Sequence, residues 1–231
     1  MQPPQNYLSD DILENSPVVA NCAMNRKRGL RGVNSYEKDL GLDIQELCLN
    51  ALRQRGCFSW LDICCGEANA LYDLSDAFPQ NAGKVQLVGI DLVGTFAPER
   101  SDTRVSIIEG SFLKWEPNDT FDLITCVHGL HYMGDKLKAI DKAPSLLNQE
   151  GQFHGHFDLN ECVLKNGTMC NLLKEHLRKS SLKYNSRKRI LTGFFPSRLQ
   201  HPWTYLGASD EAGPNYTGQP SVAAYYSSSN E

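Results

Sequence analysis

The stretch Trp60–Asn69 (WLDICCGEAN) has the composition of a ligand-binding turn. An apolar segment runs into three small residues, Cys64, Gly66 and Ala68, and then into a helix-forming segment. Small side chains let a ligand approach the backbone closely, and the N-terminus of the following helix directs free N–H groups at it. Where the strand order of a parallel sheet reverses, such a turn is typical of a nucleotide cofactor site.

Two aspartates near this turn indicate which cofactor fits. Asp62 ends the apolar segment before the turn, and Asp91 ends a second apolar segment 25 residues beyond Gly66. A carboxylate at Asp91 can accept both hydroxyls of a ribose. A carboxylate at Asp62 would repel a pyrophosphate, but it suits a ligand that bears an ammonium group. Because the GxGxxG pattern of dinucleotide sites is absent, the residues favour S-adenosylmethionine over NAD.

Five segments, in order, resemble the motifs of class I S-adenosylmethionine-dependent methyltransferases over roughly Phe58–Leu159. They are Trp60–Asn69, Asp91, Ile108–Phe112, Phe121–Met133 and Leu147–Phe153. The flanks 31–40 and 213–220 are similar to those of uncharacterised bacterial small-molecule-type members. The resemblance implies a set of cofactor contacts that includes one lid residue before the domain: Asp62, Cys64, Gly66, Ala68, Asp91, Leu92, Ser111, Phe112, Val127 and the lid residue Tyr36.

The segments also depart from the family's usual pattern. Cys64 and Ala68 replace two glycines of the first motif, both with small side chains. Ser111 stands where aspartate is common, so an adenine would meet a hydroxyl in place of a carboxylate. No Asn/Asp-Pro-Pro-aromatic tetrad follows the fourth strand segment, which counts against an enzyme that methylates amino groups of bases in nucleic acid.

Histidines lie where the resemblance places the transferred methyl group. His128 and His131 are candidate general bases, because an imidazole titrates near neutral pH. For His131, packing or loop capping is the alternative. His154, His156 and Asp158 alternate along one strand and share a face, where they could contact the acceptor, bind a metal or only pack.

We expect acceptor contacts from His128, His156 and Tyr216 and expect no metal. Tyr216 lies in a loop-rich tail with Tyr225 and Tyr226, and these aromatic residues could instead pin the C-terminal segment.

Apolar patterning places these residues on alternating strands and helices. Strands are expected over 59–64, 84–91, 104–109, 121–127 and 152–158, helices over 43–55, 67–78, 136–147 and 169–180, and an antiparallel edge over 182–192 and 202–206. Such alternation is typical of a parallel sheet with right-handed crossovers. With the resemblance, it indicates an α/β, Rossmann-like, doubly wound fold: a mostly parallel seven-stranded sheet, an antiparallel C-terminal edge hairpin and helices on both faces.

Two parts of the chain are expected. Residues 1–42 are interpreted as an N-terminal arm or lid, irregular over 1–24. Residues 43–231 are interpreted as one domain, with a cofactor half over 58–159 and an acceptor-side part over 160–231.

The composition indicates a soluble protein. Of 231 residues, 41% are apolar and 22% charged, which excludes wholesale disorder, and no apolar run reaches the length of a membrane helix. The first twenty residues lack a basic start and contain three acidic residues, so no secretory signal is expected. The eight cysteines, without CxxC pairs, are then expected to be reduced thiols in the cytoplasm.

The net charge of −4 is unevenly distributed. The basic strip, residues 174–198, has eight basic side chains and one acidic one, and a smaller basic group lies at Arg26–Arg31. Both are typical of solvated surfaces or of anion and nucleic-acid binding. The leading hypothesis is methyl transfer to an O, N or C atom of a small molecule. The alternatives are an RNA methyltransferase that uses the basic strip, a non-catalytic cofactor-binding module and a nicotinamide-dependent oxidoreductase; no oligomeric state is predicted.

Overall fold

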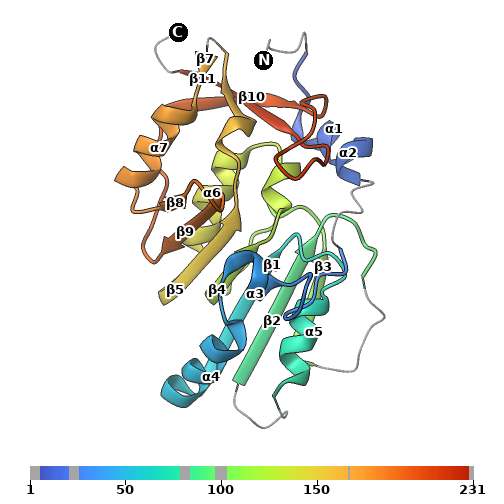
Figure 1. Cartoon of the computed structure of the whole chain (residues 1–231), viewed down its shortest axis with the longest axis vertical. Coiled ribbons are helices and arrows are strands. Elements are labelled where there is room, and N and C mark those ends of the chain that lie inside the picture. Colours follow the sequence, from blue (N-terminus) through green and yellow to red (C-terminus); the bar gives the residue numbers. More distant parts are fainter. Residues whose placement is uncertain (1–5, 21–25, 79–83, 97–102, 166, 229–231) are drawn as a thin grey trace.

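A computed structural model describes residues 6–20, 26–78, 84–96, 103–165 and 167–228 of the chain (Figure 1). The strands in these ranges are β1 (Cys57–Ile63), β2 (Lys84–Asp91), β3 (Val105–Glu109), β4 (Phe121–Cys126), β5 (Leu147–His156), β6 (Cys162–Leu164), β7 (Gly167–Thr168), β8 (Lys183–Asn185), β9 (Ile190–Phe194), β10 (Trp203–Ser209) and β11 (Ala223–Ser228). The helices are α1 (Asp10–Glu14), α2 (Pro17–Ala20), α3 (Tyr36–Leu40), α4 (Ile44–Arg55), α5 (Asn69–Asp76), α6 (Lys136–Ser145) and α7 (Cys170–Lys179), with short 3-10 helices η1 (Gly129–Tyr132) and η2 (Leu159–Glu161).

The larger sheet has the strand order β3-β2-β1-β4-β5-β9-β8. Its first five strands run parallel, whereas β9 is antiparallel to β5 and β8 is antiparallel to β9. The order reverses between β1 and β4, because the chain moves outward through β2 and β3 and then returns to the other side of β1. The mostly parallel seven-stranded sheet with an antiparallel edge is therefore confirmed, and the carboxyl ends of β1, β2 and β4 meet at the reversal point.

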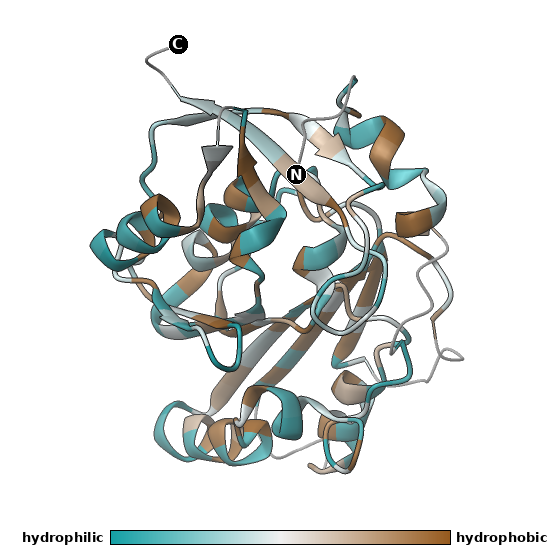
Figure 2. Cartoon of the chain, turned by 45° about the horizontal axis from the view of Figure 1, so that its top comes forward, coloured by the Kyte–Doolittle hydropathy of each residue, from teal (hydrophilic) through white to brown (hydrophobic). Residues whose placement is uncertain are grey.

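Side chains alternate between the two faces of this sheet, and each face has its own core. On β1, Trp60 packs in the core under α3, α4 and α5, whereas Leu61 and Ile63 pack in the core under α6 and α7. Leu123 and Ile124 on β4 divide in the same way. Helices therefore cover both faces, and Figure 2 shows long hydrophobic stretches on the central strands between helices of mixed hydropathy.

A second, four-stranded sheet has the order β10-β11-β6-β7, and the sequence did not predict it. β10 is antiparallel to β11, β11 is parallel to β6, and β6 is antiparallel to β7. The expectation that 202–206 joins 182–192 in one edge was wrong, because Trp203–Ser209 pairs with Ala223–Ser228 instead. Figure 1 shows this small sheet across the end of the molecule at which both chain termini lie.

Capping residues set the limits of the helices beside the site. Asp43 accepts a hydrogen bond from the backbone N–H of Glu46 (2.8 Å) at the start of α4, and Gly56 ends that helix with a φ of 71°. Asp135 accepts from the N–H of Lys138 (3.1 Å) at the start of α6. Side-chain acceptors at the N-cap satisfy N–H groups that the helix leaves free.

The N-terminal segment packs on the small sheet. Residues 1–24 were expected to be irregular, but α1 and α2 are short helices; residues 1–5 and 21–24 lie outside the described ranges. Leu8 forms an isolated antiparallel bridge with Ala208, and Asp10 accepts a hydrogen bond from the hydroxyl of Tyr205 (2.8 Å). Backbone hydrogen bonds to β10 thus hold this segment in place.

Among the described residues, no helix combines the length and the apolarity needed to cross a bilayer.

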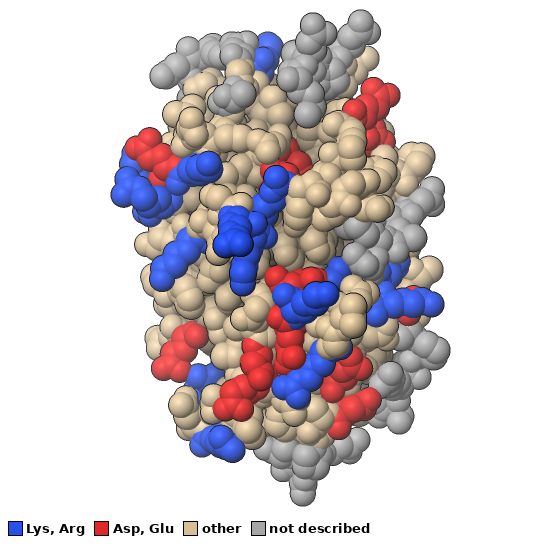
Figure 3. Space-filling model, viewed as in Figure 1, with Lys and Arg blue, Asp and Glu red and all other residues tan. Residues whose placement is uncertain are grey.

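Lys and Arg side chains gather over α7, β8 and β9 in Figure 3, where the basic strip lies. Part of its charge is neutralised within the protein, because Lys179 pairs with Glu175 (2.7 Å) and Arg198 pairs with Asp141 (2.9 Å).

Candidate functional site

A cavity of about 110 Å³, the first pocket, opens where the order of the larger sheet reverses. Its walls come from the turns after β1, β2, β3 and β4 and from the N-terminal segment. Asp62 and Ala68 do not line it. The other residues that were expected to contact a cofactor do: Tyr36, Cys64, Gly66, Asp91, Leu92, Ser111, Phe112 and Val127.

The turn after β1 has an unusual backbone. Cys64, Gly66 and Ala68 all have left-handed φ values, of 58°, 61° and 61°. At Gly66 a Cβ would lie 2.6 Å from the carbonyl oxygen of Arg26, so the close approach of these two segments requires glycine. The N–H of Gly66 donates to Asp91 Oδ2 (2.8 Å), which joins the turn to the end of β2. Ala68 is the N-cap of α5 and fully buried, which keeps it away from the cavity.

Asp91 lies at the centre of a small hydrogen-bond network. Its Oδ1 accepts from the N–H of Val93 (3.0 Å) and from Arg26 Nη1 (3.1 Å), and Arg26 Nη2 donates to the carbonyl of Val93 (2.8 Å). A carboxylate can accept about four hydrogen bonds. With Gly66 as the third donor, Asp91 has room for one more hydrogen bond, such as one from a ribose hydroxyl.

Two arginines that the sequence analysis assigned to a basic group line this cavity. Arg26 Nε is buried and has no hydrogen-bond partner, so an acceptor on a ligand would satisfy it. Arg28 is 7% exposed and forms an ion pair with Asp39. The guanidinium groups suit the carboxylate of S-adenosylmethionine, and Asp91 suits its ribose, so the donor and acceptor set fits this cofactor. The sequence signal was the basic group itself, but its position at the first pocket was missed.

Asp62 lies behind Tyr36, not in the cavity. Its carboxylate accepts hydrogen bonds from the Tyr36 hydroxyl (2.6 Å) and from Thr125 Oγ1 (2.7 Å), and Trp60 Nε1 donates to the same Thr125 oxygen (2.8 Å). Burial raises the pKa of Asp62 to about 7. Asp62 thus positions the Tyr36 ring at the cavity wall, while its contact with a cofactor ammonium group stays a prediction.

His128 follows β4 with a left-handed φ of 62° and lines the cavity. Because β4 and β5 are neighbours, its ring stacks on His156, with ring centroids 4.1 Å apart and planes 3° apart. Burial lowers the pKa of His128 to about 2 and that of His156 to about 4, so both rings are neutral near pH 7. Proton removal by His128 stays a prediction, and a pKa this low counts against it.

His131 is fully buried and lines neither pocket described here. Its Nδ1 lies 2.7 Å from Glu161 Oε1, and Lys136 Nζ, also fully buried, lies 3.5 Å from Glu161 Oε2. This network connects η1, α6 and η2. The placement favours the loop-capping alternative for His131 over a role as general base.

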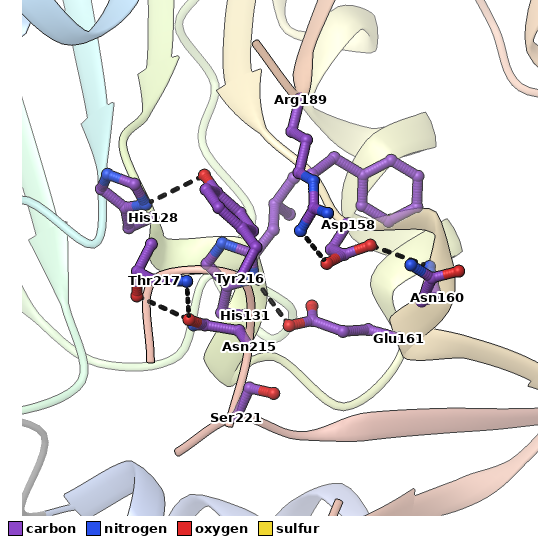
Figure 4. A network of polar contacts seen from close by, with 12 residues as sticks. His128, His131, Asp158, Asn160, Glu161, Arg189, Asn215, Tyr216, Thr217 and Ser221 are labelled. Carbon is purple, nitrogen blue, oxygen red and sulfur yellow. Dashed lines mark hydrogen bonds and ion pairs between the residues drawn. The ribbon is translucent and has the colours of Figure 1, made fainter. Parts of the chain in front are cut away.

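A second pocket of about 270 Å³ lies on the other side of Tyr216. The Tyr216 hydroxyl is 3.5 Å from His128 Nδ1, and the Arg189 guanidinium lies 4.3 Å from the centroid of the Tyr216 ring (Figure 4). Arg189 Nη1 also pairs with Asp158 Oδ2 (2.6 Å). Of the expected acceptor contacts, the structure therefore places His128 in the first pocket and Tyr216 in the second, while His156 supports His128 from behind.

His154 contacts its neighbours and neither pocket. Its Nε2 lies 2.9 Å from Gln152 Oε1, and its Nδ1 lies 3.4 Å from Thr192 Oγ1. Within the described ranges, no group of three or more His, Cys, Asp or Glu side chains is arranged to hold a metal ion.

Comparisons with known proteins find a methyltransferase domain in part of the chain. Residues 61–151 match the model of a methyltransferase domain family. An uncharacterized methyltransferase of Bacillus subtilis (strain 168), YcgJ, is 30% identical over 99 residues, which are 40% of this chain and 39% of that protein. The chain thus matches less than half the length of this relative.

Solved structures that match part of the chain include CalS10, an amino pentose methyltransferase from Micromonospora echinaspora, with a TM-score of 0.41, 20% identity and coverage of 53% of this chain and 50% of that one. The [4+2]-cyclase SpnF has a TM-score of 0.42 and 14% identity, over 76% of this chain and 63% of that one. The part of the chain that matches a methyltransferase domain, residues 61–151, contains the turns after β1, β2, β3 and β4 that wall the first pocket.

Proposed function

We propose that the protein transfers a methyl group from S-adenosylmethionine to an O, N or C atom of a small-molecule acceptor. The observation that carries the proposal is the arrangement of the first pocket at the reversal point, where Asp91, the Gly66 turn and two arginines surround one cavity. His128 lies on the same cavity and reaches Tyr216, which borders a second, polar pocket. A cofactor pocket next to an acceptor pocket is what transfer between two ligands needs.

When bound, the cofactor supplies a methyl group on a sulfonium, which is already a good leaving group. The protein's part is therefore to bind and align. Asp91 would hold the ribose, Leu92 and Phe112 would flank the base, Ser111 would offer it a hydroxyl, and Arg28 would face the carboxylate. The neutral ring of His128 would border the acceptor, with His156 stacked behind it.

Calorimetric titration tests the cofactor part of the proposal. We expect S-adenosylmethionine and S-adenosylhomocysteine to bind and NAD not to bind. Asp91→Ala should abolish binding, whereas Asp119→Ala, on the exposed loop before β4, should not change it. Binding of NAD, or of none of the three ligands, would overturn the proposal. A labelled methyl donor in fractionated cell extract then identifies acceptors.

The RNA-methyltransferase alternative has one observation in its favour. Arg189, within the basic strip, lines the second pocket, so the strip reaches the proposed acceptor site. Its charge is balanced by Asp158, however, which weakens an attraction for phosphate. Affinity for tRNA that falls steeply with salt would support this alternative. Cofactor binding without methyl transfer to any acceptor would support a non-catalytic module.

A further inference from the structure

The second pocket contains two polar side chains that are buried but incompletely hydrogen-bonded. Glu161 is 6% exposed and Asn215 is 9% exposed, and both line the pocket. Glu161 Oε2 and Asn215 Nδ2 have no hydrogen-bond partner in the protein. Buried polar atoms of folded proteins are nearly always paired, so an atom left over beside a pocket indicates a partner from outside the chain.

In each of these two side chains, the hydrogen bonds of the other polar atom determine whether the free atom is a donor or an acceptor. Asn215 Oδ1 accepts hydrogen bonds from the N–H (2.8 Å) and the Oγ1 (2.5 Å) of Thr217, which sets the orientation of the amide and leaves Nδ2 as a free donor. Glu161 Oε1 pairs with His131 Nδ1, which leaves Oε2 as a free acceptor. The ligand must therefore both accept and donate hydrogen bonds (Figure 4).

The charges around the pocket balance. Asp158 pairs with Arg189 (2.6 Å), and Lys136 Nζ lies 3.5 Å from the free oxygen of Glu161. A carboxylate ligand would meet Asp158 and Glu161 at the wall of the pocket, and an ammonium ligand would meet Arg189 at the wall and the Lys136 charge behind Glu161. A neutral group avoids both costs. A hydroxyl is neutral and both donates and accepts.

We propose that the second pocket binds hydroxyl groups of a neutral, hydroxyl-rich acceptor, which donate to Glu161 Oε2 and accept from Asn215 Nδ2. The ring of Tyr216 forms the wall toward His128, so a molecule bound here lies next to the cavity that His128 lines. The role of the bound molecule as a methyl acceptor rests on the proposed function, but its binding can be tested without methyl transfer.

Saturation-transfer NMR on the full chain, with S-adenosylhomocysteine present, tests the pocket. The probes are myo-inositol and methyl glucoside, which are neutral, with glucosamine and gluconate as charged comparators. We expect the neutral probes to bind more tightly than either charged one. Asn215→Asp keeps the acceptor for Thr217 and removes the donor, so affinity for the neutral probes should fall about three- to tenfold.

Asn185→Asp is the matched control. Asn185 Oδ1 also accepts from backbone N–H groups two and three residues ahead, those of Arg187 (3.1 Å) and Lys188 (3.0 Å), but it is exposed on β8 and away from the pocket. The affinity of the Asn185→Asp variant for the probes should equal that of the unmodified protein. The added charge of Asn215→Asp should also move preference toward glucosamine.

Three results would overturn the inference: no neutral probe binds, charged probes bind as tightly, or both aspartate variants behave alike. Failure of the proposed function has a different signature. In that case the cofactor titration fails or Asp91→Ala has no effect, whatever the sugar probes do. Cofactor binding with no probe binding would leave the methyltransferase proposal in place and remove this one.

Discussion

Replacing Tyr36 with phenylalanine removes one hydrogen bond from the buried carboxylate of Asp62 and leaves the aromatic ring in place. The Tyr36 hydroxyl donates to Asp62 Oδ2 at 2.6 Å, and Thr125 is the other donor. The edge-on contact of the Tyr36 ring with Trp60, with centroids 5.8 Å apart, does not need the hydroxyl. The variant therefore tests the hydrogen bond with little change in packing.

The cost of this change depends on pH, because Asp62 changes charge within the range of ordinary buffers. Burial raises its pKa from 3.8 to about 7, so the folded protein keeps a proton that the unfolded chain has lost. The free energy of unfolding therefore falls between about pH 4 and about pH 7, by about 4 kcal/mol in all. Above that range Asp62 is charged, and a hydrogen bond to a charged group contributes about 1.5–3 kcal/mol, against about 0.5–1.5 kcal/mol for a neutral one.

We expect Tyr36→Phe to lower the free energy of unfolding by about 1 kcal/mol at about pH 5.5 and by about 2–3 kcal/mol at about pH 8.5. Urea denaturation at both pH values measures this. Tyr184→Phe is the control, because the Tyr184 hydroxyl donates to the neutral carbonyl of Phe157 (3.0 Å) and its cost should not vary with pH. An equal cost of Tyr36→Phe at the two pH values, or a smaller cost at the higher one, would refute this account of Asp62.

Three further changes test other parts of the structure. Gly66→Ala places a Cβ 2.6 Å from the Arg26 carbonyl oxygen, at a residue whose φ is 61°. Calorimetry should therefore find the affinity for S-adenosylmethionine reduced about tenfold or more. An unchanged Kd would contradict the close approach of these two segments. His156 is neutral in the folded state, with its pKa lowered by burial to about 4, whereas the unfolded chain gains this proton below about pH 6.5. The free energy of unfolding therefore falls by about 3 kcal/mol as the pH drops through that window. In denaturation at about pH 4.5, His156→Gln should have lost correspondingly less of its stability than the unmodified protein. Equal losses in the two proteins would contradict this account of His156. Lys136→Met leaves the Glu161 carboxylate without its buried cation and should lower the free energy of unfolding, measured by urea denaturation, by about 3–5 kcal/mol. Part of this loss should be recovered in the double variant with Glu161→Gln. A loss below about 1 kcal/mol would mean that the pair contributes little.

The larger sheet could be predicted because its signal is local. The segment 84–91 alternates apolar residues between loop-forming ends, and the observed β2 has those same limits. The small sheet lacks such a signal, because β6 has three residues and β7 has two. Tyr225 and Tyr226, interpreted as aromatic residues of a loop-rich tail, are 2% and 0% exposed within β11. One of the two strands that pair with β11, β6, begins about 60 residues earlier, so this pairing depends on tertiary contacts that no short sequence window contains.

The residues of the site also divide into those that a local sequence signal could place and those that depend on tertiary packing. Asp91 is the last residue of β2 and His128 lies two residues after β4, and both could be placed because such strand ends meet at one edge of a parallel sheet. Arg26 reaches Asp91 across 65 residues from a segment without regular structure, so its destination could not be predicted. The burial of Asp62 behind Tyr36 likewise depends on how α3 packs over β1, which only the assembled core determines.

The bridge between Leu8 and Ala208 affects the order in which the protein can form during synthesis. Residues 8–20 leave the ribosome about 200 residues before β10 exists to pair with them. Leu13 and Val19, which pack with Ala208 and Val222 in the finished protein, must wait without these partners while the larger sheet assembles. Because Asp10 and Val19 are also part of the wall of the first pocket, that pocket is completed only when the last third of the chain has emerged.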